Sequence, residues 1–156
     1  AMADVPATPT AELFDLRQTH NPHRWVLPVE PRICVGPPEN TFLFGGVGLA
    51  ASIAAMERTT GRPAIWATAQ YLAYAKPGEF LDVDVIVPKQ GKHVTQARVV
   101  GHVGDREILT VNAALGARPH DVSAQWARMP DVPPPAECEP MPRFETGTRD
   151  LHQQFD

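Results

Sequence analysis

The chain has 156 residues, of which 43% are hydrophobic and 21% charged, and its formal net charge is -4. This length and composition are typical of one globular domain and unlike those of disordered or collagen-like chains. A general nucleic-acid-binding protein needs a stripe of basic residues, which this sequence lacks. The longest apolar run, residues 47–56, is too short to span a bilayer. We therefore expect a globular protein that binds neither nucleic acid nor a membrane.

The cysteines and histidines do not have the spacing of metal ligands. Cys34 and Cys138 are far apart and form no Cys-X-X-Cys pair, and the residues around His20 and His23 include no acidic cluster. The sequence therefore predicts no metal site and no cofactor. Unpaired cysteines fit a reducing compartment, and the first residues carry no apolar signal sequence, so we expect a cytoplasmic protein.

Two elements are predicted near the start of the chain. Residues 1–23 form an N-terminal extension with a short helix over residues 8–14, because Thr8 is a suitable cap and Pro9 suits the first helical position. Residues 24–29 read Arg-Trp-Val-Leu-Pro-Val and predict a first strand. A proline at position 28 indicates that this strand lies at an edge or is interrupted there.

Residues 46–58 predict one long helix, and Gly61 supplies a stop signal. The first ten positions are apolar or small on every side, which favours a helix buried all round over an amphipathic surface helix. Its glycines and alanines keep it thin. A sheet is expected to wrap closely around it.

Four strands are predicted after the helix, over residues 64–75, 79–87, 93–103 and 107–115, separated by turn residues. We expect them to form an antiparallel meander. Within the second of these strands, alternate apolar residues predict one buried face, and Asp82 and Asp84 are expected to point to solvent on the other. The predicted fold class is α+β, and the predicted domain covers residues 24–118.

The last part of the chain differs in composition. Residues 119–150 are predicted to be a connecting segment, because the proline-rich stretch 130–142 excludes a continuous helix or a central strand. Residues 151–156 have the pattern of another strand.

Several segments resemble the first repeat of acyl-CoA thioesterase II-like proteins, which are double-hotdog enzymes. They are the Phe-Leu-Phe-Gly-Gly of residues 42–46, residues 71–79 with Lys-Pro-Gly at 76–78, and residues 91–100 followed by a Gly-Asp turn. The resemblance covers residues 24–116, and residues 129–135 resemble the linker between the two repeats. It implies a hotdog fold, in which an antiparallel sheet wraps around one long central helix. Residues 151–156 would then be the first strand of a second repeat that this chain lacks.

The same resemblance predicts an incomplete active site. In this family the catalytic Asp, Ser or Thr, and Gln belong to the second repeat. The matching positions here are a helix segment without acids around Ser52, together with Ala67 and Ala114. None of these side chains supplies acid-base chemistry, so no catalytic residue is transferred to this chain.

The helix start is the best candidate for substrate binding. Phe44, Gly45 and Gly46 lie there, and the first N-H groups of a helix have no partner within it. Glycines allow a ligand to approach the backbone, and these N-H groups are suited to polarising a thioester carbonyl. The alternative is a tight loop packed against the sheet.

Two residues of the predicted strand beside the helix are further candidates. Gln70 is a weak candidate for a catalytic residue that orients water, and Tyr71 for lining an acyl pocket. The alternatives are a buried glutamine with its hydrogen bonds satisfied and a tyrosine that fills the core.

Basic side chains gather around the predicted hairpin turn at residues 89–92. Lys92 and Arg98, with Lys89 and His93 nearby, are candidates for binding the phosphates of coenzyme A. The alternative is a solvated turn.

Two functions remain open. The first is an acyl-CoA thioesterase, or the first repeat of one, which hydrolyses acyl-CoA to a free fatty acid and CoA. The second is a non-catalytic hotdog half that serves as scaffold and acyl- or CoA-binding partner of a catalytic repeat. Either function predicts a homo-oligomer or pairing with a second hotdog repeat, because an isolated hotdog exposes a strand edge.

Overall fold

The computed structural model describes residues 13–117 and 124–139. Most of the helix predicted over residues 8–14 and the whole strand predicted over residues 151–156 lie outside the described residues. These two predictions stay untested.

One helix, α1 (Gly45–Thr60), runs through the domain as predicted. It starts one residue earlier and ends two residues later than the sequence pattern indicated. Gly61 ends it with φ at 67°, a left-handed conformation that glycine adopts readily, and its N-H donates to the carbonyl of Glu57 at 2.8 Å.

The helix is buried on one side and half-buried on the other. Its sheet-facing side contains Val47, Ala51 and Met56, which are almost inaccessible to solvent. The buried Ser52 hydroxyl donates to the carbonyl of Gly48 at 2.8 Å and so keeps a hydrogen bond. Burial all round is therefore only partly correct, because Leu49, Ala50, Ile53 and Ala54 are half-buried on the side that the sheet does not cover.

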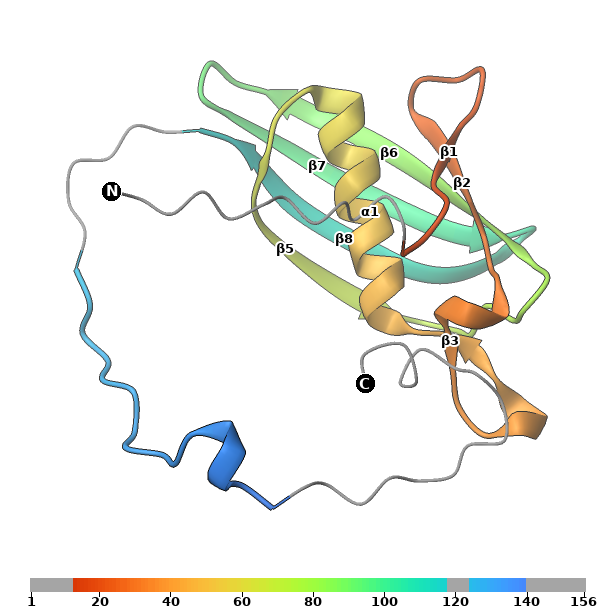
Figure 1. Ribbon diagram of the computed structural model, residues 1–156. Coiled ribbons are helices and arrows are strands. Elements are labelled where there is room, and N and C mark those ends of the chain that lie inside the picture. Colours follow the sequence, from red (N-terminus) through yellow and green to blue (C-terminus); the bar gives the residue numbers. More distant parts are fainter. Residues whose placement is uncertain (1–12, 118–123, 140–156) are drawn as a thin grey trace.

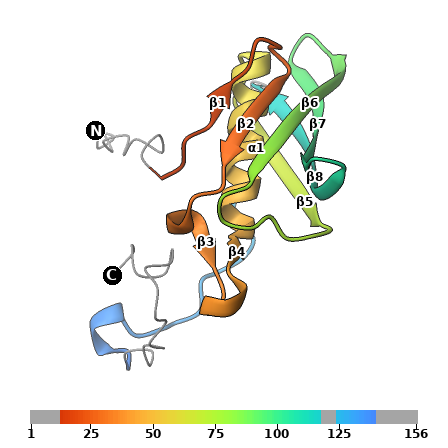
Figure 2. The ribbon, with the colours of Figure 1, turned by 90° about the vertical axis from the view of Figure 1, so that its right-hand side faces the viewer.

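An antiparallel sheet of six strands packs against the helix (Figures 1 and 2), in the order β1-β2-β6-β7-β8-β5. Its strands are β1 (Arg17–Gln18), β2 (Arg24–Pro28), β5 (Ala64–Tyr71), β6 (Phe80–Gln90), β7 (Val94–Val103) and β8 (Arg106–Gly116). A second sheet pairs β3 (Cys34–Val35) with β4 (Phe42–Leu43) below the start of the helix, and two short 3-10 helices, Pro31–Ile33 and Pro38–Asn40, flank β3. The predicted arrangement of one helix and an antiparallel sheet is confirmed.

The predicted four-strand meander is wrong in one connection. Strands β6, β7 and β8 are consecutive neighbours, but β5 pairs with β8 at the far edge and not with β6. Two backbone hydrogen bonds hold the connection over residues 72–79 in place. The N-H of Leu43 donates to the carbonyl of Ala75, and the N-H of Gly78 donates to the carbonyl of Val29, each at 2.8 Å. This path leads the chain from one side of the sheet to the other before β6 begins.

The alternation of inward and outward side chains along the strands determines which residues belong to the core. Leu81, Val83 and Val85 of β6 are buried, while Asp82 and Asp84 lie on the opposite face, as predicted. The buried residues of β7 follow the same period, whereas β8 is also buried at consecutive positions, and both strands contact the helix.

Residues 124–139 are exposed throughout and contain only a 3-10 helix at Pro135–Glu137. The proline-rich sequence explains this, because proline lacks the N-H that helices and central strands need. The role of this segment as a linker stays a prediction.

Candidate functional site

The candidate site begins at the first turn of α1. Phe44 caps the helix through its carbonyl, which accepts from the N-H of Val47 at 3.0 Å and that of Gly48 at 3.2 Å. No acceptor for the N-H of Gly45 or Gly46 is found among the described residues. Phe44 is itself fixed, because its N-H donates to the carbonyl of Ile33 at 3.0 Å. The helix start therefore presents two backbone N-H groups, those of Gly45 and Gly46, that are available as hydrogen-bond donors.

The two glycines make room for the chain's own aromatic rings. A Cβ atom at Gly45 would lie 3.1 Å from the ring of Tyr71, and one at Gly46 would lie 2.5 Å from the ring of Phe44. The Tyr71 hydroxyl also donates to the Gly45 carbonyl at 2.9 Å. The reason given for these glycines from sequence, open space for a ligand beside the backbone, is therefore incomplete.

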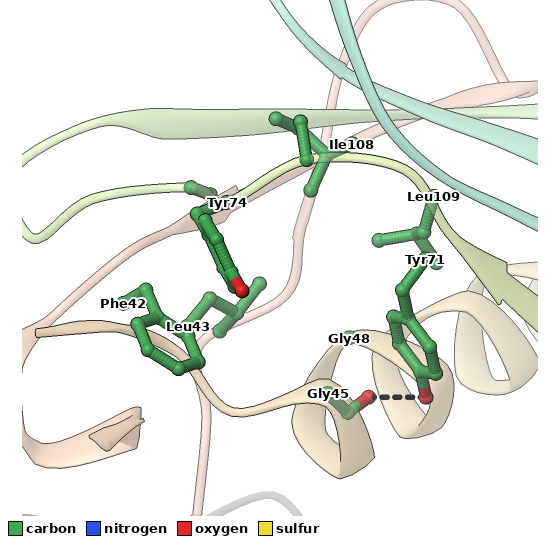
Figure 3. Close-up of a pocket in the computed structure, with 10 residues that line it drawn as sticks. Phe42, Leu43, Gly45, Gly48, Tyr71, Tyr74, Ile108 and Leu109 are labelled. Atoms are coloured by element: carbon green, nitrogen blue, oxygen red, sulfur yellow. Dashed lines mark hydrogen bonds between the residues drawn. The ribbon is translucent and has the colours of Figure 1, made fainter. Parts of the chain in front are cut away.

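An apolar pocket of about 110 Å³ adjoins this turn (Figure 3). Residues from the helix start, β4, the end of β5, the connection after it and the start of β8 surround the pocket: Phe42, Leu43, Gly45, Gly48, Tyr71, Ala73, Tyr74, Ala75, Ile108 and Leu109. Sequence reasoning found Tyr71 and Gly45 but missed the rest. Ile108 and Leu109 in particular read as ordinary strand residues, because nothing local shows that β8 passes the helix start.

No side chain of this pocket is a general base of the usual kind, since its only polar side-chain groups are the hydroxyls of Tyr71 and Tyr74. Ala67 lies on β5 and Ala114 on β8, and neither carries a functional group. The geometry suits binding of an apolar group beside hydrogen-bond donors. It does not activate water by itself.

Gln70 lies on the other face of the sheet. It pairs with Thr110 of β8, while its neighbour Tyr71 pairs with the buried Leu109. Because successive residues of a strand point to opposite faces, Tyr71 lines the pocket and Gln70 faces away from it. Gln70 is exposed and so is not the buried glutamine of the alternative interpretation.

The basic residues at the hairpin are not beside the pocket. Arg62, just after the helix, donates to the carbonyl of Gly91 at 2.9 Å and to that of Lys92 at 3.4 Å, so the hairpin adjoins the end of α1. The pocket adjoins the start of α1, and a helix of 16 residues is about 24 Å long. Arg98 points to the outer face from the middle of β7, where it is exposed.

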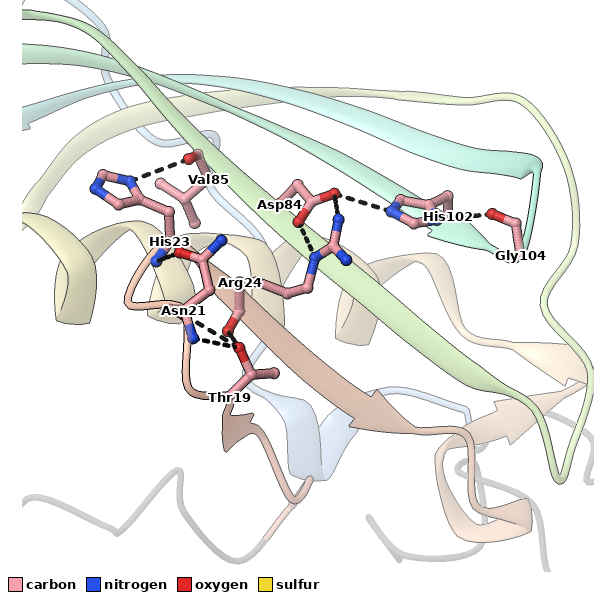
Figure 4. Close-up of polar contacts among 8 residues, drawn as sticks. All are labelled: Thr19, Asn21, His23, Arg24, Asp84, Val85, His102 and Gly104. Carbon is pink, nitrogen blue, oxygen red and sulfur yellow. Dashed lines mark hydrogen bonds and ion pairs between the residues drawn. The ribbon is translucent and has the colours of Figure 1, made fainter.

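A polar network crosses the outer face of the sheet (Figure 4). Asp84 accepts from the guanidinium of Arg24 at 2.6 and 2.8 Å and lies 2.9 Å from Nε2 of His102. Nδ1 of His102 lies 2.8 Å from the carbonyl of Gly104. Asp84 is thus partly buried in an ion-pair network that joins β2, β6 and β7, and the expectation that it simply points to solvent is incomplete.

This network shifts two pKa values. The hydrogen bond from Arg24 is the main reason that the pKa of Asp84 lies below its usual value. Burial alone would lower the pKa of His102, but its hydrogen bonds to Asp84 and Gly104 outweigh burial and raise that pKa. Arg24 of β2 and His102 of β7 are each joined to Asp84 of β6, so we assign this network a role in stabilising the sheet and not in catalysis.

The cysteines and histidines offer no other centre in residues 13–117 and 124–139. No group of three or more His, Cys, Asp or Glu residues there could hold a metal ion. Burial raises the pKa of Cys34 to about 11, so its thiol is a poor nucleophile at neutral pH. Cys138 is exposed and His23 lies near the Val85 carbonyl. None of the described helices is long and apolar enough to cross a membrane.

Comparisons with known proteins give a consistent result. No protein-family model and no curated protein matches the sequence. Solved structures do match. A "putative thioesterase" from Novosphingobium aromaticivorans is 34% identical with a TM-score of 0.75, over 81% of this chain and 49% of that one. A "putative thioesterase II" from Thermobifida fusca is 20% identical with a TM-score of 0.72, over 89% and 51%.

A third structure, of a Bacillus halodurans protein with CoA, is 16% identical with a TM-score of 0.56 and matches over 68% of this chain and 73% of that one. The chain spans about half the length of the two thioesterase-named proteins. Its fold also matches a protein described as having a hot dog fold. The chain therefore has the hotdog fold and is similar to one repeat of the double-hotdog proteins of the thioesterase II kind.

Proposed function

We propose that this chain is the acyl-binding repeat of an acyl-CoA thioesterase, which hydrolyses acyl-CoA to a free fatty acid and CoA. The observation that carries the proposal is the apolar pocket lined by Gly45, whose N-H group, like that of the next residue Gly46, has no acceptor among the described residues. An acyl chain in the pocket brings its thioester carbonyl toward these donors. The CoA in the Bacillus halodurans structure supports the choice of thiol carrier.

The chemistry needs an oxyanion site and a base. Water attacks the carbonyl carbon, the tetrahedral oxyanion accepts hydrogen bonds from the Gly45 and Gly46 N-H groups, and the C-S bond then breaks to release the CoA thiolate, which takes up a proton. The positive end of the α1 dipole adds to the stabilisation. One donor of this type contributes a factor of about 100 to 1,000 in rate.

The base is assigned to a second hotdog repeat. The pocket residues of this chain include no carboxylate or imidazole, and Ala67 and Ala114 take the places of catalytic groups in the family resemblance. The same observations favour a second candidate function, in which this chain is a non-catalytic half that supports a catalytic repeat. Both candidates share acyl binding and differ in whether this chain's own helix start stabilises the oxyanion.

The edge strand β5 is the proposed contact with a second repeat or a second copy. β5 pairs only with β8 in the described sheet, so its other edge is open, and two of its large apolar residues, Ile65 and Trp66, are each 51% exposed. Open edges of this kind favour pairing with another strand. A reducing, cytoplasmic location completes the proposal, since both cysteines are free.

Lys92 and Arg98 stay predicted contacts for the phosphates of coenzyme A, but the proposal does not depend on them. They lie away from the pocket in this chain.

A thiol-release assay tests the proposal with residues 1–156 alone and with the longest natural polypeptide that contains them. We expect the chain alone to turn over acyl-CoA poorly and the longer polypeptide to turn it over readily. Gln70→Ala should behave like its control Gln96→Ala, because both glutamines are exposed on the outer face. Fast turnover by the chain alone, lost in Gln70→Ala, would overturn the assignment of the base to another repeat. If the longer polypeptide did not hydrolyse acyl-CoA, the proposal of a thioesterase would be overturned.

A further inference from the structure

The pocket is closed at its inner end. Gly48, on the first turns of α1, faces Leu109 and Leu43, and a Cβ atom added there would lie 3.3 Å from the Leu109 Cδ2 atom and 3.7 Å from the Leu43 Cδ2 atom. Leu109 is 1% exposed and belongs to the core. An acyl chain that enters beside Gly45 therefore ends against packed side chains and not in a tunnel.

The pocket's two aromatic walls are anchored (Figure 3). Tyr71 is tied to the helix by its hydroxyl, which donates to the Gly45 carbonyl at 2.9 Å. On the other side, the ring of Tyr74 packs against that of Phe42 with centroids 4.4 Å apart, and the Lys76 ammonium lies 6.0 Å from the Tyr74 ring centroid. Swinging either wall outward costs these contacts, so the width of the pocket is set by the fold.

The volume then limits the occupant. An apolar cavity of about 150 Å³ takes a benzene-sized molecule. The volume here is about 110 Å³, which leaves room for roughly four carbon atoms by the same standard. No charged side chain lines it, so a dicarboxylic or amino-bearing acyl group would lose hydration without gaining a partner.

We infer that this pocket selects short, uncharged acyl groups of about four carbons, and that Tyr74 and Gly48 limit the space it offers. This rests on the proposed function, because it names the substrate class of the same site. Within the pocket each methylene group should tighten binding about fourfold, and methylenes beyond the fourth carbon should add nothing.

Binding of non-hydrolysable ketone analogues of acyl-CoA, in which a methylene separates the sulfur from the carbonyl, tests the inference. Isothermal titration calorimetry with the 156-residue chain should give affinities that rise from the two-carbon to the four-carbon acyl analogue and then stay level or fall at six, eight and twelve carbons. Methyl NMR signals of Ile108 and Leu109 should shift with the four-carbon analogue.

Two variants change the pocket without touching the Gly45 and Gly46 donors. Tyr74→Ala removes a wall whose side chain is 58% exposed, and should move the preferred length to six or eight carbons. Gly48→Ala adds one methyl group at the inner end and should weaken the four-carbon analogue about fourfold relative to the two-carbon one, because the methyl takes up the space of about one methylene. Phe80→Ala is the matched control, since Phe80 is 56% exposed and does not line the pocket. Thermal unfolding of each variant checks that it is folded.

The outcomes separate this inference from the proposed function. Affinity that keeps rising to eight or twelve carbons in the wild type would overturn the length limit and leave acyl-CoA binding intact. Tight binding of the analogues with no change in Tyr74→Ala and Gly48→Ala would place the acyl group elsewhere and also overturn the inference. No binding of any analogue would overturn both.

Discussion

At the scale of single residues, the His102 side chain links two neighbouring strands, because it lies on β7 and contacts Asp84 of β6. Both of its ring nitrogens face acceptors, the Asp84 carboxylate at 2.9 Å and the Gly104 carbonyl at 2.8 Å, so the doubly protonated imidazolium satisfies both. Its pKa is raised in the folded chain, despite the opposing effect of burial. The stability it contributes should therefore be present in full below about pH 6.5, the unfolded value, and be lost as the pH rises through the folded pKa.

Urea denaturation between pH 5 and 9 measures this contribution. We expect the free energy of unfolding of the wild type to lose up to about 1 kcal/mol more than that of His102→Gln over this pH rise, because partly exposed ion pairs are worth about that much. His20→Gln is the control, as His20 is exposed and makes no ion pair among the described residues. An identical pH dependence for wild type and His102→Gln would contradict the expectation.

At the scale of elements, the end of α1 depends on the conformation of one residue. Gly61 has a φ of 67° and no atom lies within 4 Å of a Cβ added there, so a larger side chain meets strain but no clash. Gly61→Ala should lower the free energy of unfolding by about 1 kcal/mol. Gly61→Asn should cost less, because asparagine tolerates the left-handed region. Urea denaturation of both variants tests this, and equal losses would show that strain in the helix stop is not the cause.

At the scale of the whole molecule, the open edge of β5 should control association. A second chain that pairs there removes an exposed edge, so the wild type is expected to be larger than a 17.1 kDa monomer in light scattering at micromolar concentration. Thr68→Lys places a charge on this exposed edge strand and should shift the population toward the monomer. Gln96→Lys is the matched control, because it adds the same charge to an exposed position of the interior strand β7. A monomeric wild type, or equal effects of both lysines, would count against pairing through β5.

The sequence by itself determined the local elements. The small apolar run with Gly61 after it specified the helix, and the alternation of Leu81, Val83 and Val85 with aspartates specified a half-buried strand, because these signals are periodic and lie within one segment. The resemblance in residues 42–46 also led to the helix start at which the pocket lies. Only the tertiary structure decided that β5 crosses to pair with β8, since strand order depends on contacts between residues far apart in the sequence.

Contacts between residues far apart in the sequence also determine which candidate residues lie at the pocket. Tyr71 and Gln70 are neighbours in sequence and equally plausible as candidates, but the register of β5 against β8 turns Tyr71 toward the pocket and Gln70 away from it. A shift of one residue would exchange them, because side chains alternate between the two faces of a sheet. Ile108, Leu109 and Tyr74 come together with Gly48 only when the sheet closes on the helix, so no local pattern could identify the pocket or its length.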